Sequence, residues 1–202
     1  LSKGHAGILL YVVLNLKGKI SQNQLNLYCN KKGKLGVHPD YETFGINAST
    51  GSLGHGLGLA AGMALAEKNL KKNFFVLMSD GELQEGSVWE NILFISSRGL
   101  KNITIIIDNN NLQSSTKASD THPTMYPIKQ KFNAFGWKSM ICDGHDLKEI
   151  EKKLVNNSKK PLALIAKTIK GFPISFMKNN PKWHYRSPTE EEYKLAIKEL
   201  SK

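Results

Sequence analysis

The stretch FFVLMSDG, residues 74–81, and the stretch ITIIIDNN, residues 103–110, decide the fold. Each is an apolar run of strand length that ends in side chains with oxygen donors, and a helix-length segment joins the two. This pattern is typical of a βαβ unit, in which a helix connects two parallel strands. Ligands of such sheets bind in the crevice outside the carboxyl ends of the strands. We therefore expect a ligand site where Asp80 and the asparagines that follow Asp108 lie.

The oxygen donors at these two strand ends suit Mg²⁺. This ion takes few ligands from the protein and leaves positions free for phosphate oxygens. The pattern predicts a diphosphate held through the metal, with Asp80 as the carboxylate ligand and an amide oxygen as a second ligand. On chemistry alone, Asn109, Asn110 and Asn111 compete for that second role. The alternative is that Asp80-Gly81 and the asparagine run are ordinary turns.

Strand and helix patterns alternate along the chain and predict a parallel α/β sheet flanked by helices. We expect strands at 74–78, 103–108, 137–142 and 162–167, and helices at 4–16, 54–69, 86–98, 128–135 and 146–157. Capping boxes that begin at Ser21 and Thr189 predict a short second helix and a final helix. Residues 31–49, 114–127 and 168–187 are expected to be irregular. The helix at 4–16 is mostly apolar, so we expect it to be buried.

Composition bounds the class of protein. The 202 residues, 40% hydrophobic and 22% charged, fit one soluble domain without a signal peptide or a membrane span. Cys29 and Cys142 lack the spacing of metal ligands, which favours reduced thiols in a cytoplasmic protein. The net charge of +11 comes from dispersed lysines without an aromatic-interleaved basic stripe. We therefore expect neither a nucleic-acid nor a membrane partner, although the charge is compatible with phosphorylated sugars.

Four motifs together resemble one known family. They are LSKGHA at 1–6, TGSLGHG at 50–56, SDGELQEG at 79–86 and DNNNLQ at 108–113. These motifs are similar to those of the thiamine-diphosphate domain of transketolases, the amino-terminal half of that enzyme, and the resemblance extends to about Pro188. The LQEG extension is more typical of transketolases than of other thiamine-diphosphate enzymes, whereas Ser79 stands where the family usually has glycine. The resemblance implies a single thiamine-diphosphate-binding domain over residues 1–202 that lacks the family's first segment and one more active-site histidine.

The resemblance also implies which residues hold the cofactor. It selects Asn110 as a metal ligand together with Asp80, and it adds the backbone carbonyl of Leu112. It implies that the backbone amide of Gly81 meets the diphosphate. Gly51 and Leu53 are implied to touch the cofactor from a loop that enters a helix, where a helix amino terminus can attract an anion. Without the resemblance, that loop is a plain tight turn.

Three of the histidines are implied to be catalytic. His5 approaches the diphosphate and substrate, His38 faces the reacting carbons, and His184 also lies at the cofactor. Relatives usually have glycine after the last of these, and Tyr185 narrows that space. Imidazoles suit the reaction because they titrate near neutrality and can bond substrate hydroxyls. No role is assigned to the remaining histidines, His55, His122 and His145.

Glu85 and Glu90 stand at the start of the helix expected at 86–98. Carboxylates at a helix start are favoured by the helix dipole, which explains them without any function. In transketolases the matching pair lies at the subunit interface and links two active sites, so the resemblance implies an interface role.

The resemblance implies a transketolase-type transferase that moves a two-carbon ketol unit from a ketose to an aldose. A pyrimidine-binding, carboxy-terminal transketolase subunit would complete the site, in a heterotetramer, because the domain that binds the aminopyrimidine has no counterpart in this chain. Sugars or sugar phosphates are the implied substrates, and exposed apolar surface would favour self-association. The alternatives are another thiamine-diphosphate enzyme, such as a deoxyxylulose phosphate synthase or a 2-oxo acid dehydrogenase component, and a non-catalytic regulatory subunit. The sequence does not identify the donor sugar, the acceptor sugar or the pathway.

Overall fold

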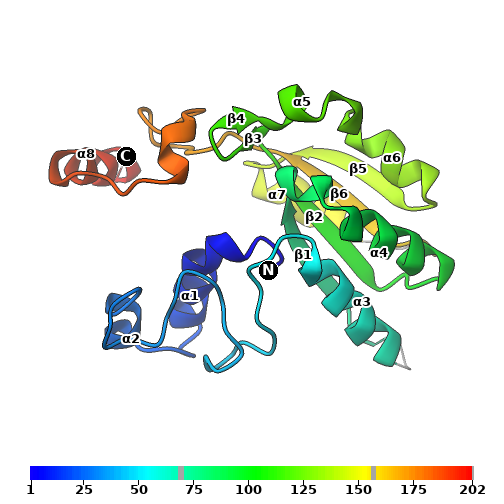
Figure 1. Cartoon of the computed structure of the whole chain (residues 1–202), viewed down its shortest axis with the longest axis horizontal. Helices are drawn as coiled ribbons and strands as arrows, with labels where there is room; N and C mark the ends of the chain where they lie inside the picture. Colours follow the sequence, from blue (N-terminus) through cyan, green and yellow to red (C-terminus); the bar gives the residue numbers. More distant parts are fainter. Residues whose placement is uncertain (68–70, 156–157, 202) are drawn as a thin grey trace.

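A four-stranded parallel sheet forms the centre of the molecule, as predicted (Figure 1). The computed structural model describes residues 1–67, 71–155 and 158–201. The sheet has the order β1-β2-β6-β5, with β1 (Phe74–Ser79), β2 (Ile103–Asn109), β5 (Lys138–Asp143) and β6 (Leu162–Lys167). In the register, Ser79 lies opposite Asp108 and Asn109 lies opposite Lys167. The carboxyl ends of the three adjacent strands β1, β2 and β6 therefore meet at one edge.

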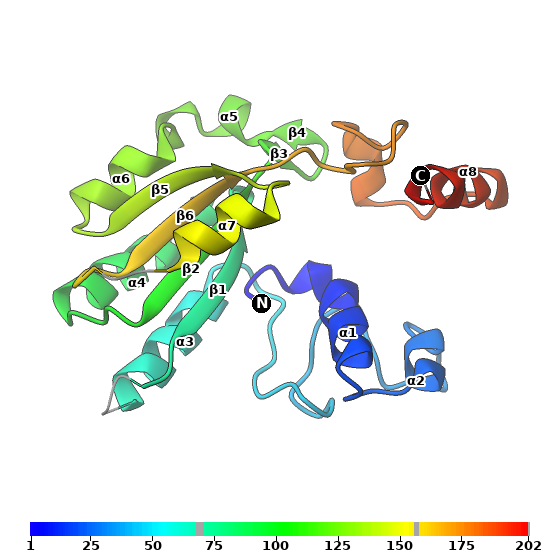
Figure 2. The same cartoon turned by 180° about the vertical axis from the view of Figure 1, so that it is seen from behind.

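Helices cover both faces of this sheet. One face packs against α3 (His55–Ala66), α4 (Gly86–Ser97) and α6 (Ile128–Ala134), and the other packs against α7 (Leu147–Leu154) (Figure 2). Successive residues of β6 point to opposite faces: Ala163 and Ile165 belong to the larger core cluster, and Leu164 and Ala166 to the cluster under α7. The continuous apolar sequence of β6 is thus explained by burial on both faces.

The first 49 residues form a lobe beside the sheet, with its own small core. The lobe contains a single 3₁₀ turn, η1 (Gly4–Ala6), and two helices, α1 (Gly7–Leu16) and α2 (Gln22–Asn26). The prediction that the first helix is buried is wrong. Along α1, Tyr11 is buried but most apolar side chains are exposed, with Leu9 at 54% and Leu16 at 79%. The small core of the lobe covers only one side of α1. The apolar residues on the other side of α1 are exposed in this chain.

The connections between elements differ from the prediction in one segment. Residues 114–127, expected to be irregular, contain β4 (Thr116–Lys117) and two short helical turns, α5 (Ala118–Thr121) and η3 (Pro123–Met125). β4 pairs with β3 (Leu112–Gln113) in a small hairpin. The segments 31–49 and 168–187 are irregular as predicted, except for a 3₁₀ turn, η4 (Pro181–His184). Both predicted capping boxes are present, on α2 through Ser21 and on α8 (Glu190–Leu200) through Thr189.

The remaining boundaries agree within a few residues. α3 begins after Gly54 and ends at Ala66, and α7 begins after its N-cap Asp146 and ends at Leu154; the predicted ends at 69 and 157 lie outside the described residues. α8 extends away from the sheet at the end of the chain (Figures 1 and 2), and its apolar side chains Tyr193, Leu195, Ile197 and Leu200 are exposed. Within the described parts of the chain, every helix is too short or too polar to cross a bilayer.

Candidate functional site

Asp80 is a buried carboxylate at the carboxyl end of β1. It is 1% exposed, and its two oxygens accept hydrogen bonds from the backbone amides of Gly81, at 2.9 Å, and Asn111, at 2.6 Å. Burial raises the pKa of Asp80 to about 6, the charge of Asp108 adds to the rise, and the two amides oppose it. Lys3, which also lies at this edge, is paired with Asp108 instead. A desolvated carboxylate without a paired lysine is a good ligand for a hard cation.

The asparagines after β2 have separate roles in the structure. The side-chain oxygen of Asn111 accepts hydrogen bonds from the amide of Ser119, at 2.9 Å, and from the hydroxyl of Tyr126, at 3.2 Å. The oxygen of Asn110 accepts one from the amide of Leu112, at 2.8 Å. Of Asn109, Asn110 and Asn111, only Asn110 lines the large cavity at this edge. The geometry therefore favours Asn110 over its neighbours as a possible ligand, in agreement with the family pattern.

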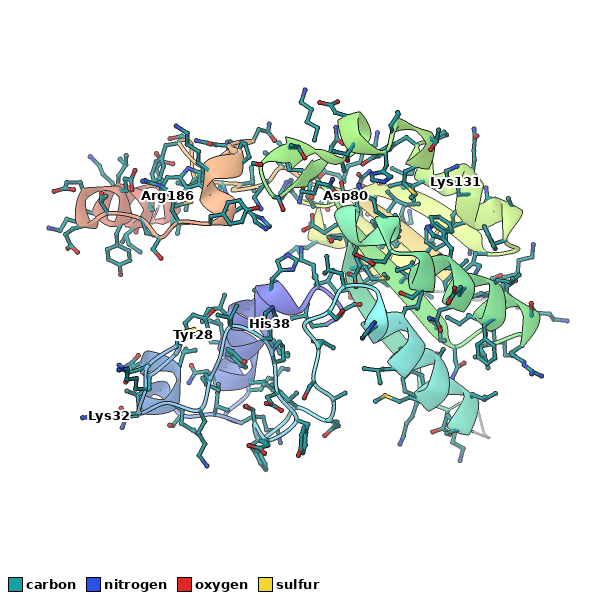
Figure 3. All side chains as sticks on the ribbon, in the orientation of Figure 1. Tyr28, Lys32, His38, Asp80, Lys131 and Arg186 are labelled. Carbon is teal, nitrogen blue, oxygen red and sulfur yellow. The ribbon has the colours of Figure 1, made fainter. Side chains whose placement is uncertain are left out.

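One cavity of about 950 Å³ brings most of the predicted site residues together. It lies outside the ends of β1, β2 and β6, and the predicted residues that line it are His5, Gly51, Leu53, Gly81, Asn110, Leu112 and His184. Asp80 is buried beside it, next to Gly81. Figure 3 shows Asp80 at the end of the sheet. Residues from five separate parts of the chain thus meet at the edge where ligands of parallel sheets bind.

Besides the buried Asp80, His38 is a predicted site residue that does not line the cavity. It is exposed in the N-terminal lobe (Figure 3), and its backbone carbonyl accepts a hydrogen bond from Tyr11 at 2.8 Å. Its ring packs against the loop that enters α3: a Cβ added to Gly51 would lie 3.2 Å from the Cγ atom of His38. His38 therefore contacts a residue of the cavity wall. Its predicted catalytic role remains a prediction.

Two lysines for which the sequence predicts no role bring positive charge to the cavity wall, which also carries the carboxylates of Asp108 and Glu85. Lys3 and Lys170 both line it, and the ammonium group of Lys170 lies 3.2 Å from Nδ1 of His184. Burial and the charge of Lys3 lower the pKa of Lys170. Burial and Lys3 also lower the pKa of His5 to about 4, so this imidazole is neutral at pH 7. Lys3 is part of the first motif, but nothing in the sequence separates Lys170 from the other lysines.

Two further missed residues hold the site together. The carboxylate of Asp108 pairs with Lys3 at 2.5 Å and accepts a hydrogen bond from the hydroxyl of Thr168. Glu82 is fully buried and bonds to both Ser2 and Gly54. The sequence gives little signal for either contact, because both depend on segments that meet only in the folded chain.

The cavity fits a diphosphate and a divalent cation. Gly81 and Gly51 both lack the side chain that would enter it: a Cβ on Gly81 would lie 3.1 Å from Gln113. In this structure the amide of Gly81 donates to Asp80. The amide of Gly54, the N-cap residue of α3, donates to Glu82 and is therefore not free to bind an anion. Among the described residues, no three His, Cys, Asp or Glu side chains form a metal-binding group. The predicted donor set, one carboxylate with amide oxygens, has the chemistry of a Mg²⁺ site and not of a Zn²⁺ site.

Among the other singled-out residues, His145 lines the cavity and also makes a structural contact. His145 accepts a hydrogen bond at Nε2 from the amide of Ile169, at 2.8 Å, and so joins the loop after β5 to the segment after β6. His55 begins α3 and His122 ends α5, both exposed. Cys29 is exposed and Cys142 is buried, and both are free thiols.

Glu85 lines the cavity and occupies the N-cap position of α4, without a capping hydrogen bond from its side chain. Glu90 is exposed on the same helix. Both positions are compatible with the helix-dipole explanation, and the interface role remains a prediction.

Comparison with known proteins gives one consistent family. Residues 1–201 match the family described as transketolase, thiamine diphosphate binding domain. An apulose-4-phosphate transketolase subunit of Phocaeicola vulgatus is 37% identical over 206 residues, which cover 100% of this chain and 73% of that protein. The 6-deoxy-6-sulfo-D-fructose transketolase subunit SqwG of a Clostridium species is 36% identical over 208 residues, covering 100% of this chain and 75% of that protein.

A solved structure has the same fold. The transketolase of Campylobacter jejuni superposes with a TM-score of 0.91 at 31% identity, over 99% of this chain and 33% of that one. The chain thus spans about three quarters of the two subunits but about a third of the longer transketolase.

Proposed function

Because this chain belongs to the family of transketolase thiamine diphosphate binding domains, we propose that it is the N-terminal subunit of a split transketolase. The supporting observation is the convergence, at one cavity, of the small-residue loop at Gly51, the imidazole of His5 and, buried beside the wall, the carboxylate of Asp80. Two relatives that this chain covers to about three quarters of their length are themselves named as transketolase subunits.

We propose that residues 1–202 act as one domain that holds thiamine diphosphate and Mg²⁺. Asp80 and Asn110, with the carbonyl of Leu112, would hold the metal, and Gly51, Leu53 and Gly81 would leave room for the cofactor. When bound, thiamine diphosphate supplies the carbon nucleophile for cleavage of a ketose between C2 and C3. On the cavity wall, Lys170 would attract phosphate groups, whereas Lys3 is paired with Asp108.

The histidines have distinct parts in this proposal. His5 is neutral at pH 7 because burial and Lys3 lower its pKa to about 4, so it bonds substrate or phosphate oxygens as a neutral imidazole. His184 faces the ammonium group of Lys170 through Nδ1. Lysine has only donors, so Nδ1 accepts, and the neutral ring has its hydrogen on Nε2, which is then a donor. His38 would act on the substrate from the N-terminal lobe.

A pyrimidine-binding subunit is the proposed partner, in a heterotetramer in the cytoplasm. The exposed apolar side of α1, which includes Leu9 on the cavity wall, supports association next to the site. Sugars or sugar phosphates are the proposed substrates. The two related subunits are named for different sugars, so the relationship leaves the donor open.

The test is reconstitution. The chain is titrated calorimetrically with thiamine diphosphate in the presence and absence of Mg²⁺, and ketol transfer is then assayed with and without a pyrimidine-binding subunit. We expect Mg²⁺-dependent binding, and transfer only in the combined sample. Binding without transfer in the combined sample would instead indicate a regulatory subunit.

A further inference from the structure

We infer that Glu82 is a positioning residue: its buried carboxylate holds the first segment of the chain and the loop before α3 against each other, so that both face the cofactor cavity. The inference rests on the proposed function for the identity of the ligand. The contacts themselves belong to the fold and do not depend on it.

The contacts of Glu82 join three separate segments. Its Oε1 atom accepts a hydrogen bond from the hydroxyl of Ser2, at 2.5 Å, and another from the amide of Gly54, at 2.8 Å. Its Oε2 atom lies 3.4 Å from the amide of Ser79, which donates to it. The side chain is 0% exposed, so water does not substitute for any of these partners.

Both tethered segments line the cavity a few residues from their contact with Glu82. Lys3 and His5 follow Ser2 directly, and Gly51 and Leu53 precede Gly54. The segments also touch each other: a Cβ on Gly4 would lie 2.7 Å from the amide nitrogen of Gly51. A shift of either segment at Glu82 therefore moves groups that face the ligand.

Glu82 itself does not line the cavity, so it acts only through these segments. A fully buried carboxylate is costly unless its oxygens are hydrogen-bonded. Here the amino terminus of α3, with its positive dipole end at Gly54, supplies part of the compensation. The carboxylate accepts from Ser2, Gly54 and Ser79, which indicates that it serves to bring these donors together.

The sharpest variant is Glu82→Gln, which keeps the size and shape of the side chain. Three donors converge on the two carboxylate oxygens, but glutamine has one oxygen and one NH₂ group, so at least one donor loses its acceptor. Ser2→Ala is the milder variant, since it removes one donor and leaves the carboxylate bonded to Gly54 and Ser79. Glu151→Gln is the matched control: it makes the same chemical change at an exposed position on α7.

Two readouts separate positioning from a general loss of stability. The first is hydrogen–deuterium exchange of the peptides that contain residues 1–6 and 50–56, without any ligand. The second is the Kd for thiamine diphosphate with Mg²⁺, well below the melting temperature. Phe132 is a buried residue of α6. Phe132→Leu therefore provides a control that lowers stability and leaves Glu82 intact.

We expect Glu82→Gln to speed exchange in both peptides and to weaken thiamine diphosphate binding about tenfold, with a smaller effect of Ser2→Ala. Glu151→Gln and Phe132→Leu should change neither readout. The inference is overturned if Glu82→Gln leaves exchange in both peptides unchanged. It is also overturned if the parent binds thiamine diphosphate and Glu82→Gln binds it with the same affinity. A parent that fails to bind thiamine diphosphate contradicts the proposed function alone, because the exchange measurement still decides the role of Glu82.

Discussion

The ammonium group of Lys3 lies 2.5 Å from a carboxylate oxygen of Asp108. This contact joins the start of the chain to the end of β2, and the hydroxyl of Thr168, just after β6, donates to the same carboxylate. Burial alone would raise the pKa of Asp108, but Lys3 and Thr168 together hold it below its usual value. The charge of Asp108 is thus balanced within the protein, and Asp80 is the strand-end carboxylate left for a metal ion.

Asp80 should be essential for metal-dependent cofactor binding. Asp80→Ala removes the carboxylate, and Asp80→Asn removes its charge at constant size. We expect both to weaken Mg²⁺-dependent binding of thiamine diphosphate by at least on the order of 10²-fold, because even second-shell changes cost 10–100-fold at metal sites. Calorimetric titration measures the affinity, with Asp120→Asn on α5 as the control. Parent-like affinity in either variant would remove Asp80 from the site.

Cofactor binding should weaken in mild acid. Burial raises the pKa of Asp80 to about 6, so below that pH a proton occupies the group that the metal needs. We expect the apparent affinity for Mg²⁺ to fall by up to about tenfold per pH unit below 6 and to level off above it. Titrations between about pH 5 and 8 measure this, and a flat profile would contradict it.

The same shift has the opposite sign for the metal-free protein. The folded-state pKa lies above the unfolded value of 3.8, so the stability that Asp80 contributes is complete below that value. It is lost as the pH rises through about 6. Denaturant unfolding without metal should therefore show a decrease across this window that Asp80→Asn lacks, and added Mg²⁺ should reverse it.

His38 should affect turnover more than cofactor affinity. Its ring contacts Gly51 from outside the cavity wall, and its predicted role is toward the substrate. His38→Ala should lower turnover of the reconstituted enzyme by ~10²–10⁴-fold, the usual effect of removing an acid–base group. His122→Ala is the control for loss of an exposed imidazole. Turnover of the His38 variant equal to that of the control would exclude the role.

This chain alone should have no ketol-transfer activity. The purified chain is supplied with Mg²⁺, thiamine diphosphate, a ketose phosphate donor and an aldose acceptor. We expect background rates until a pyrimidine-binding subunit is added, because the proposed division of labour assigns half of the site to that subunit. Transfer by the chain alone would refute this division.

Two glycines, Gly54 at the N-cap of α3 and Gly62 within α3, should respond to alanine with opposite signs. Gly54 has a φ of +85°, and an added Cβ would lie 2.5 Å from Oγ of Ser87. Gly54→Ala should therefore lower the free energy of unfolding by at least about 1–2 kcal/mol. Gly62, on the exposed side of the same helix, has open space around it, and Gly62→Ala should raise stability by about 0.5–1 kcal/mol. Denaturant unfolding measures both, and equal effects would show that backbone conformation does not decide them.

The strands were predictable because their sequence patterns are strong. β6 begins and ends where predicted, since its apolar run is bounded by Pro161 and polar residues. The strand predicted at 137–142 lies at 138–143 in the structure. Trp137 is apolar and as buried as a strand residue, but it precedes the strand, and its ring nitrogen donates to the carbonyl of Ile92. The strand end in the same way pointed to Asp80, whereas the family resemblance, and not the strand pattern, selected Asn110 among three asparagines.

The remaining features depend on contacts that a sequence pattern does not contain. α5 and η3 have four and three residues, too short for helical periodicity to be visible. The apolar pattern of α1 was correct, but periodicity does not say what covers an apolar face. In the sequence, Glu82 and Lys170 resemble many surface residues of their types. The fold places Glu82 at the amino terminus of α3 and Lys170 on the cavity wall.

The strand order β1-β2-β6-β5 has a consequence for how the chain is made. A ribosome releases β5 before β6, yet β6 is the neighbour of both β2 and β5. Until residue 167 has left the exit tunnel, β5 has no parallel strand to pair with, and the β1-β2 pair stays open at the edge that β6 will occupy. The sheet is therefore completed when β6, the last of the four strands in the sequence, is inserted between β2 and β5. The folding rate depends on these long-range pairings. The edge that gathers the cavity residues exists only once that late insertion has taken place.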